Sequence, residues 1–227
     1  MNHPIYAVFS AHTYSKPHWL NGAVAFVEKE MDLDGGHDWG HLSRVLNQAL
    51  CIARTVETRK VDLEILVAAV LFHDIVNLPK DSPNRKDASK LSAEKAIAFF
   101  ASEFSKIRSE KLRNAIEAHS FSAGISITCI EAEIVQDADR LESVGALAIA
   151  RTFYVSGLMG TDLFHPEDPF GETREKRNDR KYAVDHFFQK VFLLPDLMHS
   201  KYAKELAYSR NAFVEKFLDA LRLELNL

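Results

Sequence analysis

The most constraining feature of this sequence is an apolar run that ends in a histidine and a carboxylate. Residues 65–72 (ILVAAVLF) would be buried in any fold, and His73 and Asp74 follow them directly. An isolated carboxylate in such a place costs many kcal/mol, on the order of tens in the Born limit, so Asp74 must be paired, protonated or bound to a cation. Imidazole and carboxylate groups are both ligands of divalent metal ions, and the pair therefore favours a metal site.

The composition is that of a globular protein. At 227 residues, 47% of them hydrophobic, the chain suits one domain or one domain with an appended lobe, and its net charge of −4 gives no general attraction to nucleic acid. No segment approaches the roughly 20 apolar residues of a membrane span, and the N-terminus shows no signal peptide. Cys51 and Cys129 lie in apolar stretches without a CxxC pair, which indicates buried thiols in a reducing compartment. We expect a cytoplasmic protein without membrane or nucleic-acid partners.

Long segments with helical periodicity predict an all-α fold. Nine glycines and seven prolines leave these segments largely uninterrupted, and no alternating strand pattern is present. We expect Asp38 and Asp62 to be N-caps. The expected helices span residues 17–31, 39–59, 62–74, 92–104, 107–120, 129–153 and 181–194, followed by a long amphipathic helix to about residue 225. The segment 155–180, rich in glycine, proline and charge, is longer than most structureless loops and is expected to be a lid or binding loop.

Four positions in this helical pattern form one candidate metal-binding set. His41 shares a helix face with Val45, Ala49 and Ile52, so it points inward like the apolar residues. The set contains His41, His73, Asp74 and one aspartate of the Asp137-Ala-Asp139 segment. Two imidazoles and two carboxylates suit Mn²⁺, Fe²⁺, Co²⁺, Ni²⁺ or Zn²⁺. By the same periodicity, His119 is a second histidine that faces inward.

The motifs around these positions resemble the HD-domain superfamily of metal-dependent phosphohydrolases, and in particular the branch typified by YedJ and YpgQ. The resemblance covers nearly the whole chain from about residue 21. It is carried by the stretches HDWGHLSRV (37–45), FHDIVN (72–77), VQDADRL (135–141), AHSFS (118–122), AIARTF (148–153), PEDP (166–169) and KYAVDHF (181–187).

The resemblance implies an HD-type helical fold in a single domain spanning residues 1–227. The metal-binding core would cover about residues 21–153, with the loop 155–180 over the site and the helices of 181–225 packed on the core. The implied ligands are His41, His73, Asp74 and Asp139, which leaves Asp137 a structural role.

The implied acid/base group is open. Some family members carry a glutamate three residues after the aspartate of the HD pair, and this sequence has Asn77 there. Asp74, His119 or the water bound to the metal therefore remain as candidates. Implied substrate contacts are Lys80 and Arg85 in the basic loop after the HD pair, and Arg140, Lys181 and His186. The run from 174 to 180 is expected to be a solvated edge of the lid.

The implied activity is hydrolysis of a nucleotide, most simply of a nucleoside or deoxynucleoside triphosphate with release of pyrophosphate. Mn²⁺ is the expected ion, with Mg²⁺, Co²⁺, Ni²⁺, Fe²⁺ or Zn²⁺ as alternatives. A nucleotide monophosphatase, a cyclic-nucleotide phosphodiesterase or an alarmone hydrolase would use the same site. A helical module that senses a metal or nucleotide without turnover is the non-enzymatic alternative. The apolar stripes of the last two helices are core or a dimer surface, so a homodimer is a further possibility.

Overall fold

The structure is a computed structural model that describes residues 3–31, 38–56, 60–78, 84, 87–120 and 123–226. The chain divides into two compact units, Met1–Asp139 and Arg140–Leu227. Within the described residues all regular structure is helical, and the only extended pairing is an isolated bridge between Asp162 and Tyr182. The prediction of an all-α fold is confirmed. A single domain with the long loop over the site stays a prediction.

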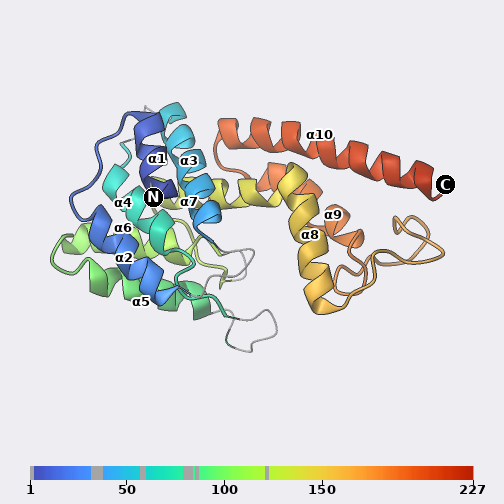
Figure 1. The fold of residues 1–227 in the computed structure, drawn as a ribbon, viewed down its shortest axis with the longest axis horizontal. Helices are drawn as coiled ribbons and strands as arrows, with labels where there is room; N and C mark the ends of the chain where they lie inside the picture. The colour runs from blue at the N-terminus through green and yellow to red at the C-terminus, as the bar shows by residue number, and fades with distance from the viewer. Residues whose placement is uncertain are drawn as a thin grey trace. The chain divides into compact units, whose positions relative to one another are not determined.

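The first unit is built around its most apolar helix. Its described helices are α1 (Pro4–His12), α2 (Leu20–Glu30), α3 (Trp39–Thr55), α4 (Leu63–Phe72), α5 (Ala88–Phe99), α6 (Lys106–Glu117) and α7 (Ile130–Arg140), as labelled in Figure 1. Helix α4 packs against α2, α3, α5 and α6, and every residue from Ile65 to Phe72 is buried. Since α4 has no polar face, it needs neighbours on all sides, and this requirement places His73 at the centre of the unit.

The predicted caps of α3 and α4 are confirmed. The Asp38 carboxylate accepts a hydrogen bond from the His41 backbone N–H at 2.7 Å, and the Asp62 carboxylate accepts one from the Ile65 N–H at 3.2 Å. Such caps satisfy donors that a helix leaves unpaired in its first turn. The inward face of α3 is also confirmed, because His41 and the apolar residues that share its face are buried.

Several helices in the first unit differ from the sequence-based expectation, including α2, which begins at Leu20 rather than residue 17, and α6, which ends at Glu117 rather than residue 120. Helix α1 was not expected, although Pro4 at its start and the spacing of its buried Ile5 and Phe9 are helical signals. Helix α5 spans Ala88–Phe99 rather than 92–104, and Ser92 lies inside it, buried. Helix α3 ends at Thr55, and residues 57–59, where a longer helix was expected to end, lie outside the described residues.

Two general expectations have mixed outcomes. Both cysteines are free, as expected, but Cys51 and Cys129 are half-buried rather than buried. None of the helices in the described ranges is long and apolar enough to cross a membrane.

The second unit contains a break where one continuous helix was expected. Instead of a helix over 129–153, the chain forms α7, the 3-10 helix η3 (Leu141–Ser143) and α8 (Gly145–Met159). Gly145 has φ +67°, and a Cβ there would lie 2.8 Å from the Arg210 Cβ. This left-handed conformation and the close approach require glycine, and they separate α7 from α8.

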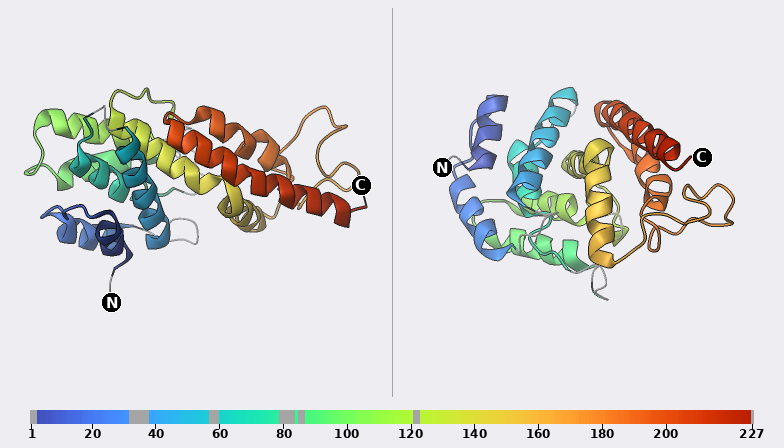
Figure 2. Two further views of the ribbon diagram at one scale, coloured as in Figure 1. Left: turned by 90° about the horizontal axis from the view of Figure 1, so that it is seen from above. Right: turned by 45° about the vertical axis from the view of Figure 1, so that its right-hand side comes forward.

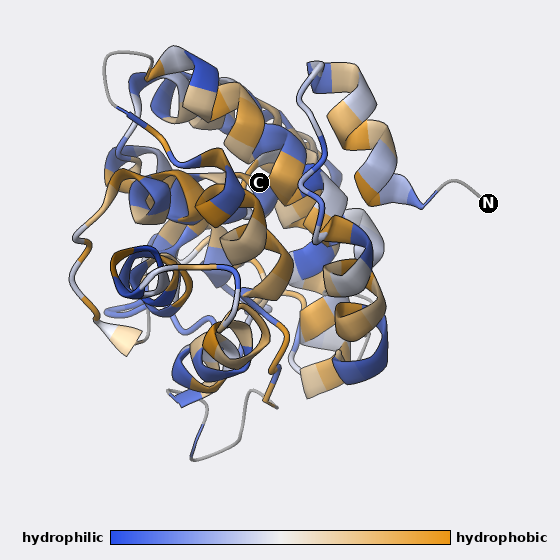
Figure 3. Cartoon of the chain, turned by 90° about the vertical axis from the view of Figure 1, so that its left-hand side faces the viewer, coloured by the Kyte–Doolittle hydropathy of each residue, from blue (hydrophilic) through white to orange (hydrophobic). Residues whose placement is uncertain are grey.

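The end of the chain is also more divided than the periodicity indicated. The remaining elements are α9 (Asp185–Gln189), the 3-10 helix η4 (Val191–Leu197) and the long α10 (Lys201–Glu224), drawn in red in Figure 2. The expected helix over 181–194 is therefore wrong in extent. Pro195 does not end a helix but lies inside η4. Figure 3 shows hydrophilic and hydrophobic residues mixed along most helices, as expected for amphipathic helices that bury one face.

The irregular segment 160–184 is organised by two buried carboxylates. Asp168 accepts hydrogen bonds from the backbone N–H groups of Glu172 at 2.8 Å, Thr173 at 3.0 Å and Arg174 at 2.9 Å. The Arg174 guanidinium donates two bonds to Asp185, at 3.0 and 2.8 Å. The expectation that the run 174–180 is a solvated edge is therefore wrong for Arg174, because this side chain is the anchor of the loop.

Candidate metal centre

Three helices of the first unit bring four predicted ligands together. His41 lies in the first turn of α3, His73 caps the C-terminus of α4, and Asp139 lies near the C-terminal end of α7. The His41 and His73 Nε2 atoms are 3.3 Å apart, and Asp139 Oδ1 is 3.7 Å from the first and 3.8 Å from the second. Asp74 Oδ2 lies 3.4 Å from His73 Nε2. Both imidazoles are essentially inaccessible to solvent, at 1% and 0% exposure.

The separations agree with donors that share one ion. Ligand atoms about 2.1 Å from a common ion are about 3.0 Å apart at right angles and about 4.2 Å apart when opposite. The group formed by His41, His73 and Asp139 has all its ligand atoms within 4.8 Å of one another, and so has a second group formed by His73, Asp74 and His119. His73 belongs to both groups, so the two describe one cluster rather than two separate sites.

The hydrogen bonds of the histidines show why this cluster suits a cation. His73 Nδ1 lies 2.8 Å from the Val70 carbonyl oxygen, and His119 Nδ1 bonds to the Ile116 carbonyl oxygen. A carbonyl can only accept, so each Nδ1 carries a proton, and in the neutral ring Nε2 then presents a lone pair. The His73 lone pair faces carboxylate oxygens of both Asp74 and Asp139. Acceptors converging in this way are stabilised by a cation, and the residues present therefore suit a divalent metal.

The electrostatics of the two inner histidines differ. Burial lowers the pKa of His73 despite the attraction of Asp74, which keeps this ring neutral. Burial also opposes charge on His119, but the hydrogen bond and charge of Asp74, with Asp139, outweigh it and raise the pKa of His119 to about 9. His119 Nε2 is 3.3 Å from Asp74 Oδ1. In the absence of an ion, a proton is therefore held between His119 and Asp74.

Several residues that hold the cluster in place were not singled out from the sequence. The Ser92 hydroxyl, buried in α5, accepts a hydrogen bond from the Val76 backbone N–H at 3.1 Å and so fixes the turn that follows Asp74. The Phe72 ring lies 5.4 Å from Phe99 and 5.3 Å from Phe100, centroid to centroid. The sequence gives little indication of the bond between Ser92 and Val76, because it joins segments 16 residues apart.

The structure distinguishes the two aspartates of α7. Asp139 is 30% exposed and directed at the histidines, whereas Asp137 is completely buried. This geometry agrees with the choice of Asp139 as the ligand. Asn77, which takes the place of a glutamate found in some family members, is half-buried at the end of the turn after the HD pair.

The structure describes only some of the residues expected to contact the substrate. Lys80 and Arg85 lie outside the described residues. In the second unit, the Arg140 guanidinium donates to the Leu197 carbonyl, and His186 Nδ1 is 3.1 Å from Asp179 Oδ2. The Lys181 ammonium lies 5.2 Å from the centroid of the Tyr182 ring. Substrate binding by these residues stays a prediction.

Comparisons with known proteins agree with the site. Residues 38–144 match the model of the HD domain family. The protein YpgQ of Bacillus subtilis is 32% identical over 198 residues, which cover 86% of this chain and 87% of YpgQ. A crystal structure of YpgQ in complex with ADP has a TM-score of 0.65, with 27% identity over 90% of this chain and 93% of that one. An HD-superfamily hydrolase from Bacillus thuringiensis has a TM-score of 0.69, with 27% identity over 91% of this chain and 96% of that one.

The chain belongs to the HD-domain family, a class of metal-dependent phosphohydrolases. The helical fold and the resemblance seen in the sequence motifs are both confirmed at this level. YpgQ is a relative that this chain matches over most of the length of both proteins.

Proposed function

We propose that this protein hydrolyses nucleoside or deoxynucleoside triphosphates to the monophosphate and pyrophosphate, with Mn²⁺ as its activating ion. The observation that carries the proposal is that the ligand atoms of His41, His73 and Asp139 lie within 4.8 Å of one another, with an Asp74 oxygen 3.4 Å from His73 Nε2. A mixed set of two imidazoles and two carboxylates suits Mn²⁺ and leaves coordination positions for water and substrate. The structure of YpgQ with ADP supports a nucleotide as the substrate.

The four proposed ligands divide into two roles. His41 and His73 supply neutral nitrogen donors, and the His73 proton is fixed on Nδ1 by the Val70 carbonyl, which leaves Nε2 for the ion. Asp74 and Asp139 supply the negative charge that balances the cation. When bound, a divalent ion lowers the pKa of water and neutralises charge on phosphoryl oxygens.

His119 is the proposed proton carrier. The Ile116 carbonyl holds the ring by its Nδ1–H, so the second proton of the imidazolium is on Nε2 and faces Asp74. A proton at that atom can be given to a leaving phosphate oxygen and taken back from water, as general acid and base catalysis requires. We also propose that Lys80 and Arg85 neutralise the substrate phosphates, since guanidinium and ammonium groups are the usual phosphate partners in proteins.

A hydrolysis screen resolved by ion and product tests this function. Metal-stripped protein receives Mn²⁺, Mg²⁺, Co²⁺, Ni²⁺, Fe²⁺ or Zn²⁺ together with mono-, di-, tri- and cyclic nucleotides, and pyrophosphate and orthophosphate are assayed separately. We expect metal-dependent release of pyrophosphate from triphosphates, greatest with Mn²⁺. Release of orthophosphate from monophosphates, opening of cyclic nucleotides, or metal binding with no turnover would each contradict the proposal. The exposed His18, changed to alanine, is a matched control for histidine substitutions in the cluster.

A further inference from the structure

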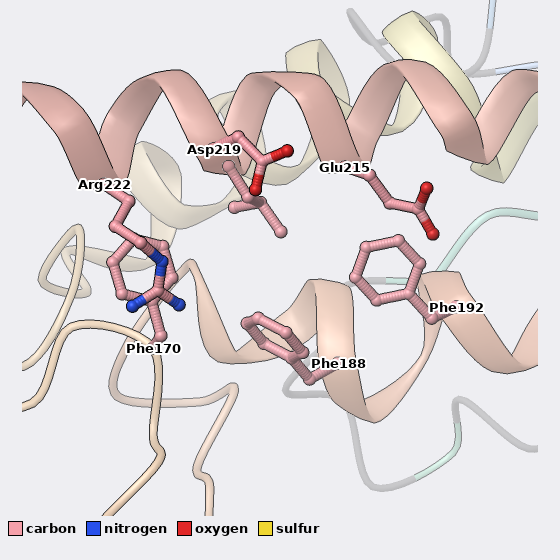
Figure 4. A pocket seen from close by; sticks show the side chains of 7 residues that line it. Phe170, Phe188, Phe192, Glu215, Asp219 and Arg222 are labelled. Carbon is pink, nitrogen blue, oxygen red and sulfur yellow. The ribbon is translucent and has the colours of Figure 1, made fainter.

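The second unit contains a pocket that shares no residue with the metal centre. It lies between α10 and the segments around α9 and η4, and it has a volume of about 250 Å³. Figure 4 shows that phenyl rings line one side and charged side chains of α10 the other. The residues that define its chemistry are Phe170, Phe188, Phe192, Glu215, Asp219 and Arg222.

Two of the three phenyl rings already hold guanidinium groups of the protein. The Arg222 Cζ lies 4.2 Å from the centroid of Phe170, and the Arg177 Cζ lies 4.3 Å from that of Phe188. Arg222 is fixed in this position by an ion pair with Glu172 at 2.6 Å. The negative face of an aromatic ring attracts cations, and the second unit uses this attraction twice around one pocket.

The third ring, Phe192, and the carboxylates of Glu215 and Asp219 also line the pocket, and they differ from the first two rings in their partners. The Phe192 centroid lies 5.6 Å from that of Phe188, and within the described part of the chain no cationic side chain lies over the Phe192 ring. Glu215 and Asp219 are four residues apart on α10, so they lie on the same face, and both are exposed. Neither carboxylate forms a close ion pair with a described lysine or arginine, and the nearby Arg222 guanidinium, which attracts Asp219, is paired with Glu172. Figure 4 shows the Glu215 carboxylate beside Phe192.

We propose that this pocket binds a small organic cation, an ammonium or guanidinium group on a short aliphatic chain. The cation would lie against Phe192 and be balanced by Glu215 and Asp219, while the aliphatic part would contact Leu218 and the neighbouring rings. The same carboxylates repel phosphates, and the Arg222 guanidinium that lines the pocket is already paired with Glu172, so the pocket favours a cation over a nucleotide. The assignment is independent of the proposed hydrolysis, because no residue of the pocket belongs to the metal centre.

Methyl NMR of the full-length protein tests the proposal. The probe is butylguanidinium chloride, the neutral comparator of similar length is 1-pentanol, and the signal followed is the Leu218 methyl pair. We expect saturable shifts with butylguanidinium that weaken as salt is raised, and binding of 1-pentanol about tenfold weaker or more, because the cation–π and carboxylate contributions are lost. Equal binding of the two probes, or no shift with either, would overturn the proposal.

Substitutions locate the binding within the pocket. Phe192→Leu, Glu215→Gln and Asp219→Asn should each weaken butylguanidinium binding about threefold. Phe213→Leu and Glu224→Gln alter exposed residues of α10 that do not line the pocket, and both should bind as the unchanged protein does. Equal loss in the control variants would show that the probe binds elsewhere and would overturn the assignment.

The free cation can be distinguished from a cationic side chain of another protein with the peptide acetyl-Gly-Arg-Gly-amide. The peptide presents a guanidinium on a backbone that must stay outside a small pocket. We expect the peptide to bind no more tightly than butylguanidinium, and clearly tighter binding of the peptide would contradict a small-molecule site.

Discussion

Both units of this protein shield carboxylates from solvent, fully in the second unit and partly in the first, but they satisfy them in opposite ways. In the second unit, Asp168 and Asp185 are surrounded by donors, namely the backbone N–H groups of the loop and the guanidinium of Arg174. In the first unit, Asp74 and Asp139 face imidazole Nε2 atoms, and the Nδ1 protons of His73 and His119 are given to backbone carbonyls. The carboxylates of the second unit have their hydrogen bonds satisfied by the protein itself. In the first unit, carboxylate oxygens and imidazole lone pairs lie close together, an arrangement that suits a cation.

This difference predicts different roles for similar residues in the two units. A carboxylate that is saturated by N–H donors stabilises the fold, and it anchors the irregular segment 160–184 in the absence of regular structure. A carboxylate that converges with histidines is available for a metal. The following changes test the contrast between the two arrangements.

The largest expected effect is on catalysis. His73→Ala removes the donor common to both candidate metal groups, and we expect loss of bound metal and a fall in kcat of about a thousandfold, because a catalytic ion supplies several kcal/mol of transition-state stabilisation. Helix content by circular dichroism should change little. Retention of activity by metal-depleted His73→Ala protein would exclude the mechanism, and His18→Ala serves as the matched control.

The next effect is on stability and belongs to the second unit. Asp185 is completely buried, and Asp185→Asn removes the closer of the two carboxylates that contact the Arg174 guanidinium, leaving Asp168 at 3.3 Å. We expect the free energy of unfolding to fall by about 3 kcal/mol, the usual cost of breaking a buried ion pair. Denaturant titration measures this change. The exposed Glu175, changed to glutamine in the same loop, should have almost no effect.

The corresponding aspartate-to-asparagine change in the metal centre should raise the free energy of unfolding rather than lower it. In metal-free protein, Asp139→Asn replaces an acceptor with an amide that can donate to an imidazole lone pair, and we expect a gain of about 1 kcal/mol in the free energy of unfolding. Loss of stability as large as that of Asp185→Asn would show that the cluster is a structural ion-pair network. The same variant should bind metal poorly.

The smallest effect is a pH dependence. Burial opposes ionisation of Asp168, but the N–H groups of Glu172, Arg174 and Thr173 outweigh it and hold the pKa of this carboxyl well below its usual range. A carboxyl with a depressed pKa stabilises the folded state above the pKa of the unfolded chain, about 3.9, and this contribution is lost as pH falls toward the folded-state value. The difference in melting temperature between wild type and Asp168→Asn should therefore be largest near neutral pH and shrink below about pH 4. A difference independent of pH would contradict this account.

The parts of the fold that could be predicted are those set by local chemistry. The apolar run before His73 and the caps at Asp38 and Asp62 were readable because each depends on neighbours within a few residues. The break at Gly145 was not, since the close approach of Arg210 comes from a residue 65 positions away. The role of Ser92 could not be predicted for the same reason, because its partner Val76 is 16 residues away. The role of Arg174 could not be predicted because a run of charged residues does not indicate which of them pairs with a buried carboxylate.

The residues of the candidate site could be proposed from the sequence, but their arrangement could not. Motif resemblance selected His41, His73, Asp74 and Asp139 from the sequence, yet spacing alone could not show that the His73 lone pair faces two carboxylates. That orientation depends on the hydrogen bond from His73 Nδ1 to the Val70 carbonyl, which only the three-dimensional structure contains.

The most direct test of the central claim is a crystal structure of the protein with Mn²⁺, with the ion located by anomalous scattering. We predict a peak about 2.2 Å from His41 Nε2, His73 Nε2, a carboxylate oxygen of Asp74 and Asp139 Oδ1. A peak elsewhere, or none at saturating Mn²⁺, would contradict the assignment of these residues as the metal centre.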